Sequence, residues 1–203
     1  HNPTWAADLD CGPIRTSYLD EYARFLAAVV RRYSVAPYNV RYFELGNEPD
    51  NGDPVNQGWV GGCWGKGPNQ AAGAGGDAYA NMLKVAYPAM KAANPNIIVT
   101  MGGLAYEAWQ PEGPYDPNFL DDMLAAGGGA YFDVINYHFY EAFTYKWGSV
   151  VNKGRSMQDK VRAYLDPLHA KGLKIIYSIK DVYAGTKYFH EPVLGLRGEE
   201  EIV

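Results

Sequence analysis

The sequence VRYFELGNEPD, residues 40–50, is the stretch that decides the fold. Its first part, through Leu45, consists mainly of β-branched, aromatic and aliphatic residues without glycine or proline, so it predicts a buried strand. A polar cluster follows and is closed by Pro49, which has no N–H to extend a ladder. Glu48 at the mouth of an apolar strand is a candidate catalytic group, because burial favours the protonated carboxyl that a general acid needs. A strand ending in an ordinary turn is the alternative interpretation.

Helix and strand patterns alternate outward from this stretch. Apolar residues recur at helical spacing over residues 17–33 and again after residue 77, with Ser17 and Asp77 as predicted N-caps. Further strands are predicted at residues 97–101, 132–140 and 173–177, and further helices at 156–171 and from residue 116 or 118. Helix followed by strand, four times over, predicts a parallel sheet with covering helices, an α/β fold.

Composition and net charge indicate which kinds of partner are not expected. The chain has 203 residues, 47% hydrophobic and 20% charged, without a repeat or linker, which predicts a single domain over residues 1–203. A net charge of −5 and a pI near 5.3 argue against a nucleic-acid partner. No run approaches the ~18 apolar residues of a membrane span, so no membrane partner is expected.

The motif LGNEP, residues 45–49, resembles the strand-4 signature of the clan A retaining glycoside hydrolases, which are (β/α)8 TIM barrels. In that clan the acid/base Glu follows an Asn at the end of strand 4. The resemblance therefore implies that Glu48 is the acid/base and that Asn47 hydrogen-bonds the sugar 2-hydroxyl. Within the clan, the segments PTWA (3–6) and CGP (11–13) together with LGNEP most resemble family 39, which includes β-xylosidases.

The segment YHFY, residues 137–140, ends another predicted strand, where His138 and Tyr140 share one face. A histidine in a strand, taken alone, is more often a core residue with satisfied hydrogen bonds. Strand 6 of the clan commonly supplies such a His and Tyr beside the nucleophile, so the resemblance implies that these two residues orient that nucleophile.

The nucleophile itself is not evident. Retaining glycosidases need a second carboxylate about 5–5.5 Å from the first, and the clan places a Glu on strand 7. The matching position in IIYSIKD, residues 175–181, is Ile179, and Asp181 is two residues further on. Glu107 and Glu141 follow other predicted strands. A carbohydrate-binding relative without catalysis is therefore the alternative to a glycosidase that cleaves β-linked poly- or oligosaccharides.

Aromatic residues near the predicted catalytic end suit stacking on sugar rings, which makes Trp5, Trp64 and Trp109 the predicted substrate-binding residues. Trp64 lies in a long Gly-rich segment, residues 51–76, and a loop of that length is usually functional. Burial of Trp64 against the barrel rim is the alternative.

Two cysteines, Cys11 and Cys63, fall in loops that follow adjacent strands, on the same end of the barrel. A disulfide between them is feasible and would fit a secreted enzyme, extracellular or periplasmic. Two unpaired thiols are the alternative. The four histidines show no metal-ligand spacing, so no metal or other cofactor is expected.

The resemblance extends from the end of strand 3 through strand 7, while a complete barrel takes about 250 residues. A partial barrel, about strands 4 to 7, would leave bare sheet edges. We expect that the missing remainder of a longer enzyme completes it. An oligomer built on those open edges is the alternative.

Overall fold

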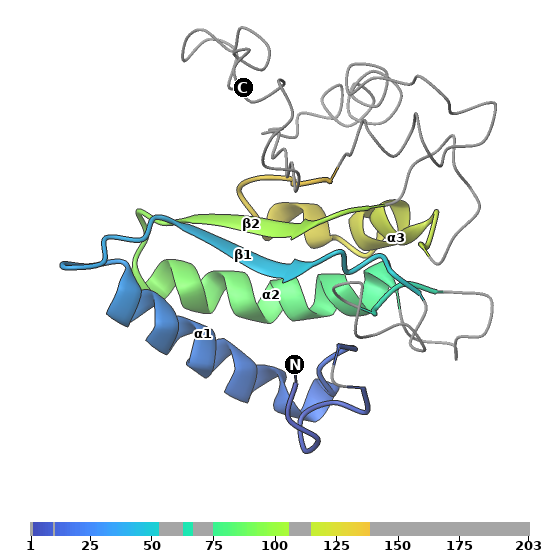
Figure 1. Ribbon diagram of the computed structural model, residues 1–203, viewed down its shortest axis with the longest axis horizontal. Coiled ribbons are helices and arrows are strands. Elements are labelled where there is room, and N and C mark those ends of the chain that lie inside the picture. The colour runs from blue at the N-terminus through green and yellow to red at the C-terminus, as the bar shows by residue number, and fades with distance from the viewer. Residues whose placement is uncertain (1, 10, 53–62, 67–74, 106–114, 139–203) are drawn as a thin grey trace, which may run out of the picture.

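The computed structural model describes residues 2–9, 11–52, 63–66, 75–105 and 115–138. Helices and strands alternate along these segments (Figure 1). Their bounds are α1 Leu19–Tyr33, β1 Tyr42–Asn47, α2 Gly76–Ala93, β2 Ile98–Gly103 and α3 Phe119–Ala125, with the 3-10 turns η1 Thr16–Tyr18 and η3 Gly128–Ala130. The predicted helix at 156–171 and the predicted strand at 173–177 lie outside the described residues.

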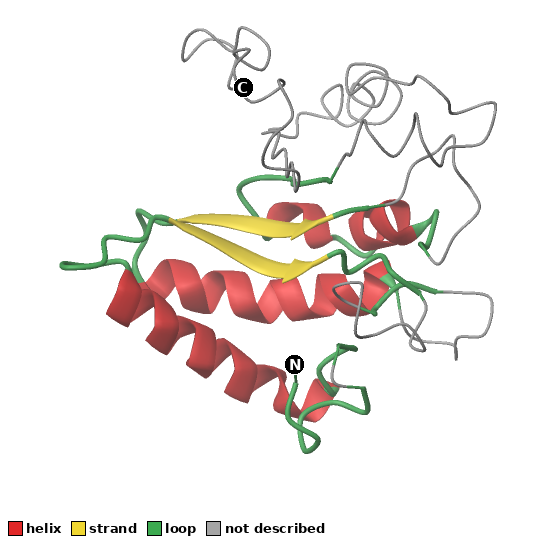
Figure 2. Ribbon diagram, viewed as in Figure 1, coloured by secondary structure: helices red, strands yellow, loops and turns green. Residues whose placement is uncertain are grey.

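The sheet is parallel. β1 pairs with β2 from Tyr42 opposite Ile98 to Asn47 opposite Gly103, and both arrows point the same way in Figure 2. The segment after η3 lies along the other side of β2. Val134 of this segment forms a parallel bridge with Thr100 of β2, and Tyr137 forms a second parallel bridge with Leu104, the residue after β2. Parallel neighbours joined through helices are β/α units, so the predicted α/β fold is confirmed.

The core lies between α2 and the sheet. α2 packs between α1 and α3, and Figure 1 shows it running alongside β1 with α1 beyond it. Fully buried side chains of α2, such as Leu83 and Met90, share this core with Val99 and Met101 of β2. Each such side chain stabilises the fold by about 1.5–3 kcal/mol relative to exposure.

The opposite face of β1 is open in the described residues. The two-residue alternation turns Phe43 and Leu45 toward the helices, and it leaves Tyr42 and Glu44 exposed on the other face. That face is the one from which Glu44 reaches the neighbouring strands, as described below.

The two N-cap predictions are wrong. Ser17 lies inside η1, and α1 begins at Leu19 without a side-chain cap. α2 begins at Gly76, so Asp77 stands in the first turn, where a negative charge favours the helix dipole. A side chain at position 76 would collide with the backbone of α3 at Phe119. Close helix packing sets this helix start.

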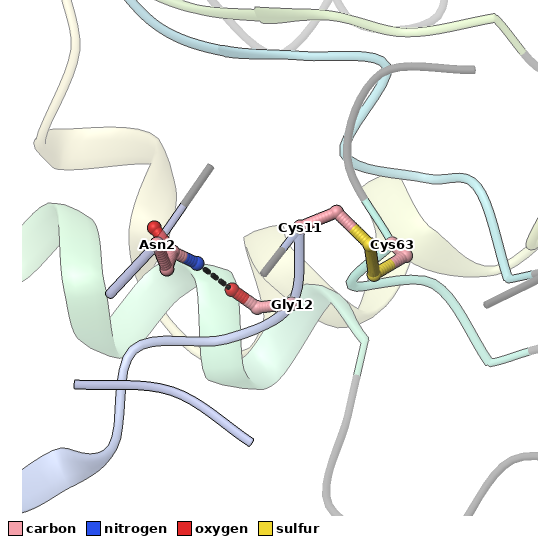
Figure 3. Close-up of a disulfide and its surroundings, with 4 residues drawn as sticks. All are labelled: Asn2, Cys11, Gly12 and Cys63. Atoms are coloured by element: carbon pink, nitrogen blue, oxygen red, sulfur yellow. Dashed lines mark hydrogen bonds between the residues drawn. A yellow bond between two sulfur atoms is a disulfide. The ribbon is translucent and has the colours of Figure 1, made fainter. Parts of the chain in front are cut away.

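The disulfide between Cys11 and Cys63 is confirmed. It joins the loop before α1 to the loop after β1, two segments 52 residues apart in sequence. The Cys63 N–H also donates to the Cys11 carbonyl at 3.1 Å, and the Asn2 amide donates to the Gly12 carbonyl at 2.8 Å beside it (Figure 3). Closing a loop of this length stabilises the fold by about 4 kcal/mol in the chain-entropy account.

The described helices include none that is long and apolar enough to cross a membrane.

A carboxylate ties the far end of the sheet to α2. Asp133 accepts hydrogen bonds from the Tyr87 hydroxyl at 2.8 Å, the Lys91 ammonium at 3.1 Å and the Val99 N–H at 2.8 Å. Partial burial alone would raise the pKa of Asp133, but these three donors and the charge of Lys91 outweigh it and hold the pKa below the usual value. Burial and the neighbouring carboxylate together raise the pKa of Tyr87 to about 12.

We therefore predict that Asp133→Asn lowers the free energy of unfolding at pH 7 by about 1–2 kcal/mol. Since the folded state lowers the pKa of Asp133, its contribution is complete above the ordinary aspartate pKa and is lost as the pH falls through the folded value. Urea titrations at pH 7 and pH 3 should show the deficit narrowing in acid. Asp20→Asn, on the exposed face of α1, is the matched control. An equal deficit at both pH values would contradict this account.

Candidate active site

Glu48 follows β1 directly and has an unusual backbone conformation. Its φ is +46°, in the left-handed region that costs a residue other than glycine about 1–3 kcal/mol. Two hydrogen bonds hold it there: its N–H donates to the Gly103 carbonyl at 2.9 Å, and its carbonyl accepts from the Asn51 N–H at 3.1 Å. Backbone strain of this kind clusters at functional sites, and only 9% of Glu48 is exposed.

The Glu48 side chain contacts a histidine on the far side of β2. Its Oε1 lies 2.8 Å from Nδ1 of His138, and the His138 side chain is almost entirely buried. The His138 N–H donates to the Leu104 carbonyl at 2.7 Å, which fixes the segment that carries the ring. Either the imidazole donates to the carboxylate or a protonated carboxyl donates to the imidazole, so the pair can hold one proton on either partner.

Gly103 lies between these two residues. It is the last residue of β2, its carbonyl accepts from Glu48, and a Cβ at this position would collide with Nε2 of the His138 ring and press on the Asn136 amide. The imidazole therefore occupies the space that a side chain would fill. The sequence pattern marked this glycine only as the end of a strand.

A second carboxylate, which the sequence analysis missed, joins the same three strands. Oε1 of Glu44 accepts from the Gly103 N–H and from the Asn136 side-chain amide, both at 3.0 Å. The two-residue period of a strand could have revealed this carboxylate in the sequence. By that period Glu44 would share a strand face with Glu48, and Asn136 would share one with His138. Acidic and amide side chains in otherwise apolar strands point to an inward polar network.

Buried aspartates hold the loops at this end of the sheet. Asp50 accepts from the Ala105 N–H with both carboxylate oxygens, at 3.1 and 2.9 Å, and its carbonyl accepts from the Asp116 N–H at 2.7 Å. Asp116 in turn accepts from the N–H groups of Lys66 and Asn118 at 2.7 and 2.9 Å. The loops after β1 and β2 are thus joined to the start of α3, and they give Glu48 a rigid support.

The structure places the other predicted site residues as follows. Asn47 ends β1 opposite Gly103, next to Glu48 in the chain. Trp5 is 55% exposed and packs edge-on against Tyr18, with ring centroids 5.2 Å apart. Trp64 is buried, so the alternative of packing against the rim holds for it. Tyr140, Trp109 and Ile179 lie outside the described residues. Among the residues that the structure describes, no cluster of His, Cys, Asp and Glu could hold a metal ion.

A family model now gives this site its context. The model described as cellulase (glycosyl hydrolase family 5) matches residues 1–178. The chain belongs to this family. Family 5 is a clan A glycoside hydrolase family, so the predicted clan is confirmed. The matching family model is that of family 5, whereas the sequence motifs had most resembled family 39 of the same clan.

A solved structure shares the fold of this glycosyl hydrolase family 5 chain. A glucosidase from Croceicoccus marinus superposes with a TM-score of 0.50 at 20% identity, over 86% of this chain and 33% of its own. A family 39 β-xylosidase from Caulobacter crescentus reaches 0.49 at 20% identity, over 86% and 32%. The chain spans about a third of the length of these two structures. The family model and the likeness to the glucosidase confirm the predicted α/β fold of the TIM-barrel type. None of the curated proteins compared with it matches.

The space at Gly103 gives a test of the site. Gly103→Ala should force the His138 ring away from Glu48. If the pair acts in catalysis as proposed below, we predict that this change lowers glycosidase kcat about 100-fold, as small misplacements of catalytic groups can. Steady-state kinetics on an aryl β-glycoside, with a thermal melt to check folding, measure the effect. Gly12→Ala, whose added methyl meets only the Leu9 side chain, is the control and should keep kcat. A Gly103→Ala enzyme with normal kcat would contradict the geometry.

Proposed function

We propose that the protein is a retaining glycosidase that cleaves β-linked poly- or oligosaccharides, with Glu48 as its acid/base. The observation that carries this proposal is the contact of 2.8 Å between Glu48 and His138 at the carboxyl end of parallel strands. Barrel enzymes place their chemistry at that end. Membership of a cellulase family supports a β-linked substrate.

The proposed mechanism needs Glu48 to donate a proton in the first step and to accept one in the second. In the first step the Glu48 carboxyl protonates the glycosidic oxygen as the bond from that oxygen to the anomeric carbon breaks. A second carboxylate forms the glycosyl-enzyme ester at that carbon. In the second step the Glu48 carboxylate takes a proton from water, which attacks the anomeric carbon and releases the enzyme. His138 keeps the carboxyl aimed in both states through its contact with Oε1, which leaves Oε2 of Glu48 to give up the proton and to take it back.

The remaining roles are part of the same proposal. Asn47 would hydrogen-bond the sugar 2-hydroxyl, and Trp5, exposed beside the N-terminal loop, would stack on a sugar ring. Tyr140 would stand beside the nucleophile. The disulfide supports an extracellular or periplasmic site of action, because such bonds persist in oxidising compartments.

One sequence observation favours a second candidate. Ile179 occupies the position at which the clan resemblance places the nucleophile. A chain that keeps Glu48 but has no carboxylate to form the ester would bind carbohydrate without turning it over. Calorimetry with a β-linked oligosaccharide separates the two candidates, since the second predicts binding with no reducing ends released after long incubation.

The direct test replaces the acid. Glu48→Gln keeps the size of the side chain and removes its proton, so we predict a loss of kcat of about 100- to 10,000-fold on glycosides with poor leaving groups. The loss should be smaller for aryl glycosides whose leaving group needs no protonation, and added azide should restore turnover by replacing the water that Glu48 activates. Glu21→Gln, a surface change on α1, is the control. Full activity in Glu48→Gln would overturn the assignment.

A further inference from the structure

A tyrosine hydroxyl is inserted between β1 and β2 immediately below Glu48. Tyr79 projects from the first turns of α2 and is 1% exposed. Its hydroxyl donates to the Leu45 carbonyl at 2.5 Å and accepts from the Gly102 N–H at 2.8 Å. One side chain thus bridges the two strands by hydrogen bonds that neighbouring strands normally make directly.

The pairing of β1 with β2 is interrupted at the position of this hydroxyl. Leu45 pairs with Met101 and Asn47 with Gly103, while Gly46 and Gly102, between them, form no pair in the described ladder. In a parallel ladder that pair would need a direct bond from the Gly102 N–H to the Leu45 carbonyl, which are the two groups that Tyr79 occupies. Gly46 has a φ of +97° at this point, so β1 turns there before it pairs again.

Tyr79 is itself held firmly. Its ring packs edge-on against Trp64, with centroids 5.3 Å apart, and lies tilted against Phe119, with centroids 5.5 Å apart. Trp64 follows Cys63 of the disulfide, and its N–H donates to the Pro49 carbonyl at 3.1 Å, one residue after Glu48. Burial raises the pKa of Tyr79 far above its usual value, so the phenol keeps the proton that it donates to the strand.

We propose that Tyr79 is a positioning residue for the acid/base: its hydroxyl holds the β1–β2 ladder open between Leu45 and Gly102 and thereby sets the turn that aims Glu48 at His138. This inference rests on the proposed function. Tyr79 is separated from the reacting atoms by the strand, so it acts only through the backbone of residues 45–48. Without the hydroxyl, the two backbone groups would bond directly or lose their partners, and Glu48 would leave its orientation in either case.

The chain offers a matched control on the same helix. Tyr87, also on α2, donates its hydroxyl to Asp133, on the segment that follows η3 and away from Glu48. Tyr79→Phe and Tyr87→Phe each remove one hydroxyl and its hydrogen bonds. If Tyr79 is only structural, both variants should lose stability and keep their chemistry.

The experiment compares both variants with wild type and Glu48→Gln in the full-length protein. For Tyr79→Phe we expect kcat on a β-linked oligosaccharide, whose leaving group needs protonation, to fall about tenfold with little change in KM. We also expect a shift in the limb of the kcat pH profile that reports the acid. Tyr87→Phe should keep both kcat and profile. The ring protons of His138, assigned by NMR with His138→Gln, should titrate differently in Tyr79→Phe alone.

The outcomes separate the two proposals. If Glu48→Gln loses activity while Tyr79→Phe keeps the wild-type kcat, pH profile and His138 titration, the positioning role is wrong and the proposed function stands. If Glu48→Gln stays active, the proposed function is wrong. The NMR titration then decides the positioning role alone: a shift confined to Tyr79→Phe supports it, and an unchanged His138 signal overturns it.

Discussion

The contact between Glu48 and His138 reaches from the end of β1, across β2, to the segment after η3 that is bridged to β2. Adjacent strands lie about 4.8 Å apart, so residues at the ends of β1 and of the segment after η3 are separated by the width of β2. Two long side chains can cross that width only if the strand between them has no side chain in the way. Gly103 supplies that gap, and its carbonyl also anchors the Glu48 backbone. The catalytic proposal, the strain at Glu48 and the burial of His138 all depend on this one glycine.

Burying a carboxyl beside an imidazole needs partners for every polar group. A buried charge without a partner is strongly destabilising. Removing one member of a buried pair is therefore costly, because the other member stays buried and unpaired. Around the site, Glu44 accepts hydrogen bonds from the Gly103 N–H and from the Asn136 amide, and Asp50 and Asp116 join the loops. The resulting rigidity suits a group that must be aimed within a few tenths of an ångström.

Much of this arrangement could be predicted from the sequence. The helical spacing of residues 17–33 and the apolar strands led to the correct fold class, because periodicity is a local property of the chain. The resemblance of LGNEP pointed to Glu48, whose catalytic role stays a prediction. The partners of the acid were harder to find. His138 was expected beside a strand-7 carboxylate, and that segment lies outside the described residues. The structure shows His138 in contact with Glu48, 90 residues away in sequence. Glu44, Gly103 and Tyr79 were missed because their roles depend on which strands are neighbours.

Catalysis as proposed requires that Glu48, aimed by His138, reaches the glycosidic oxygen. A crystal structure of the protein with an uncleavable S-linked β-oligosaccharide tests this requirement. We expect the Glu48 carboxyl within about 3 Å of the linking sulfur, on the side of the leaving group, with the contact to His138 intact. A bound glycan whose linking atom lies beyond reach of Glu48, or a Glu48 that leaves His138 when sugar binds, would contradict it.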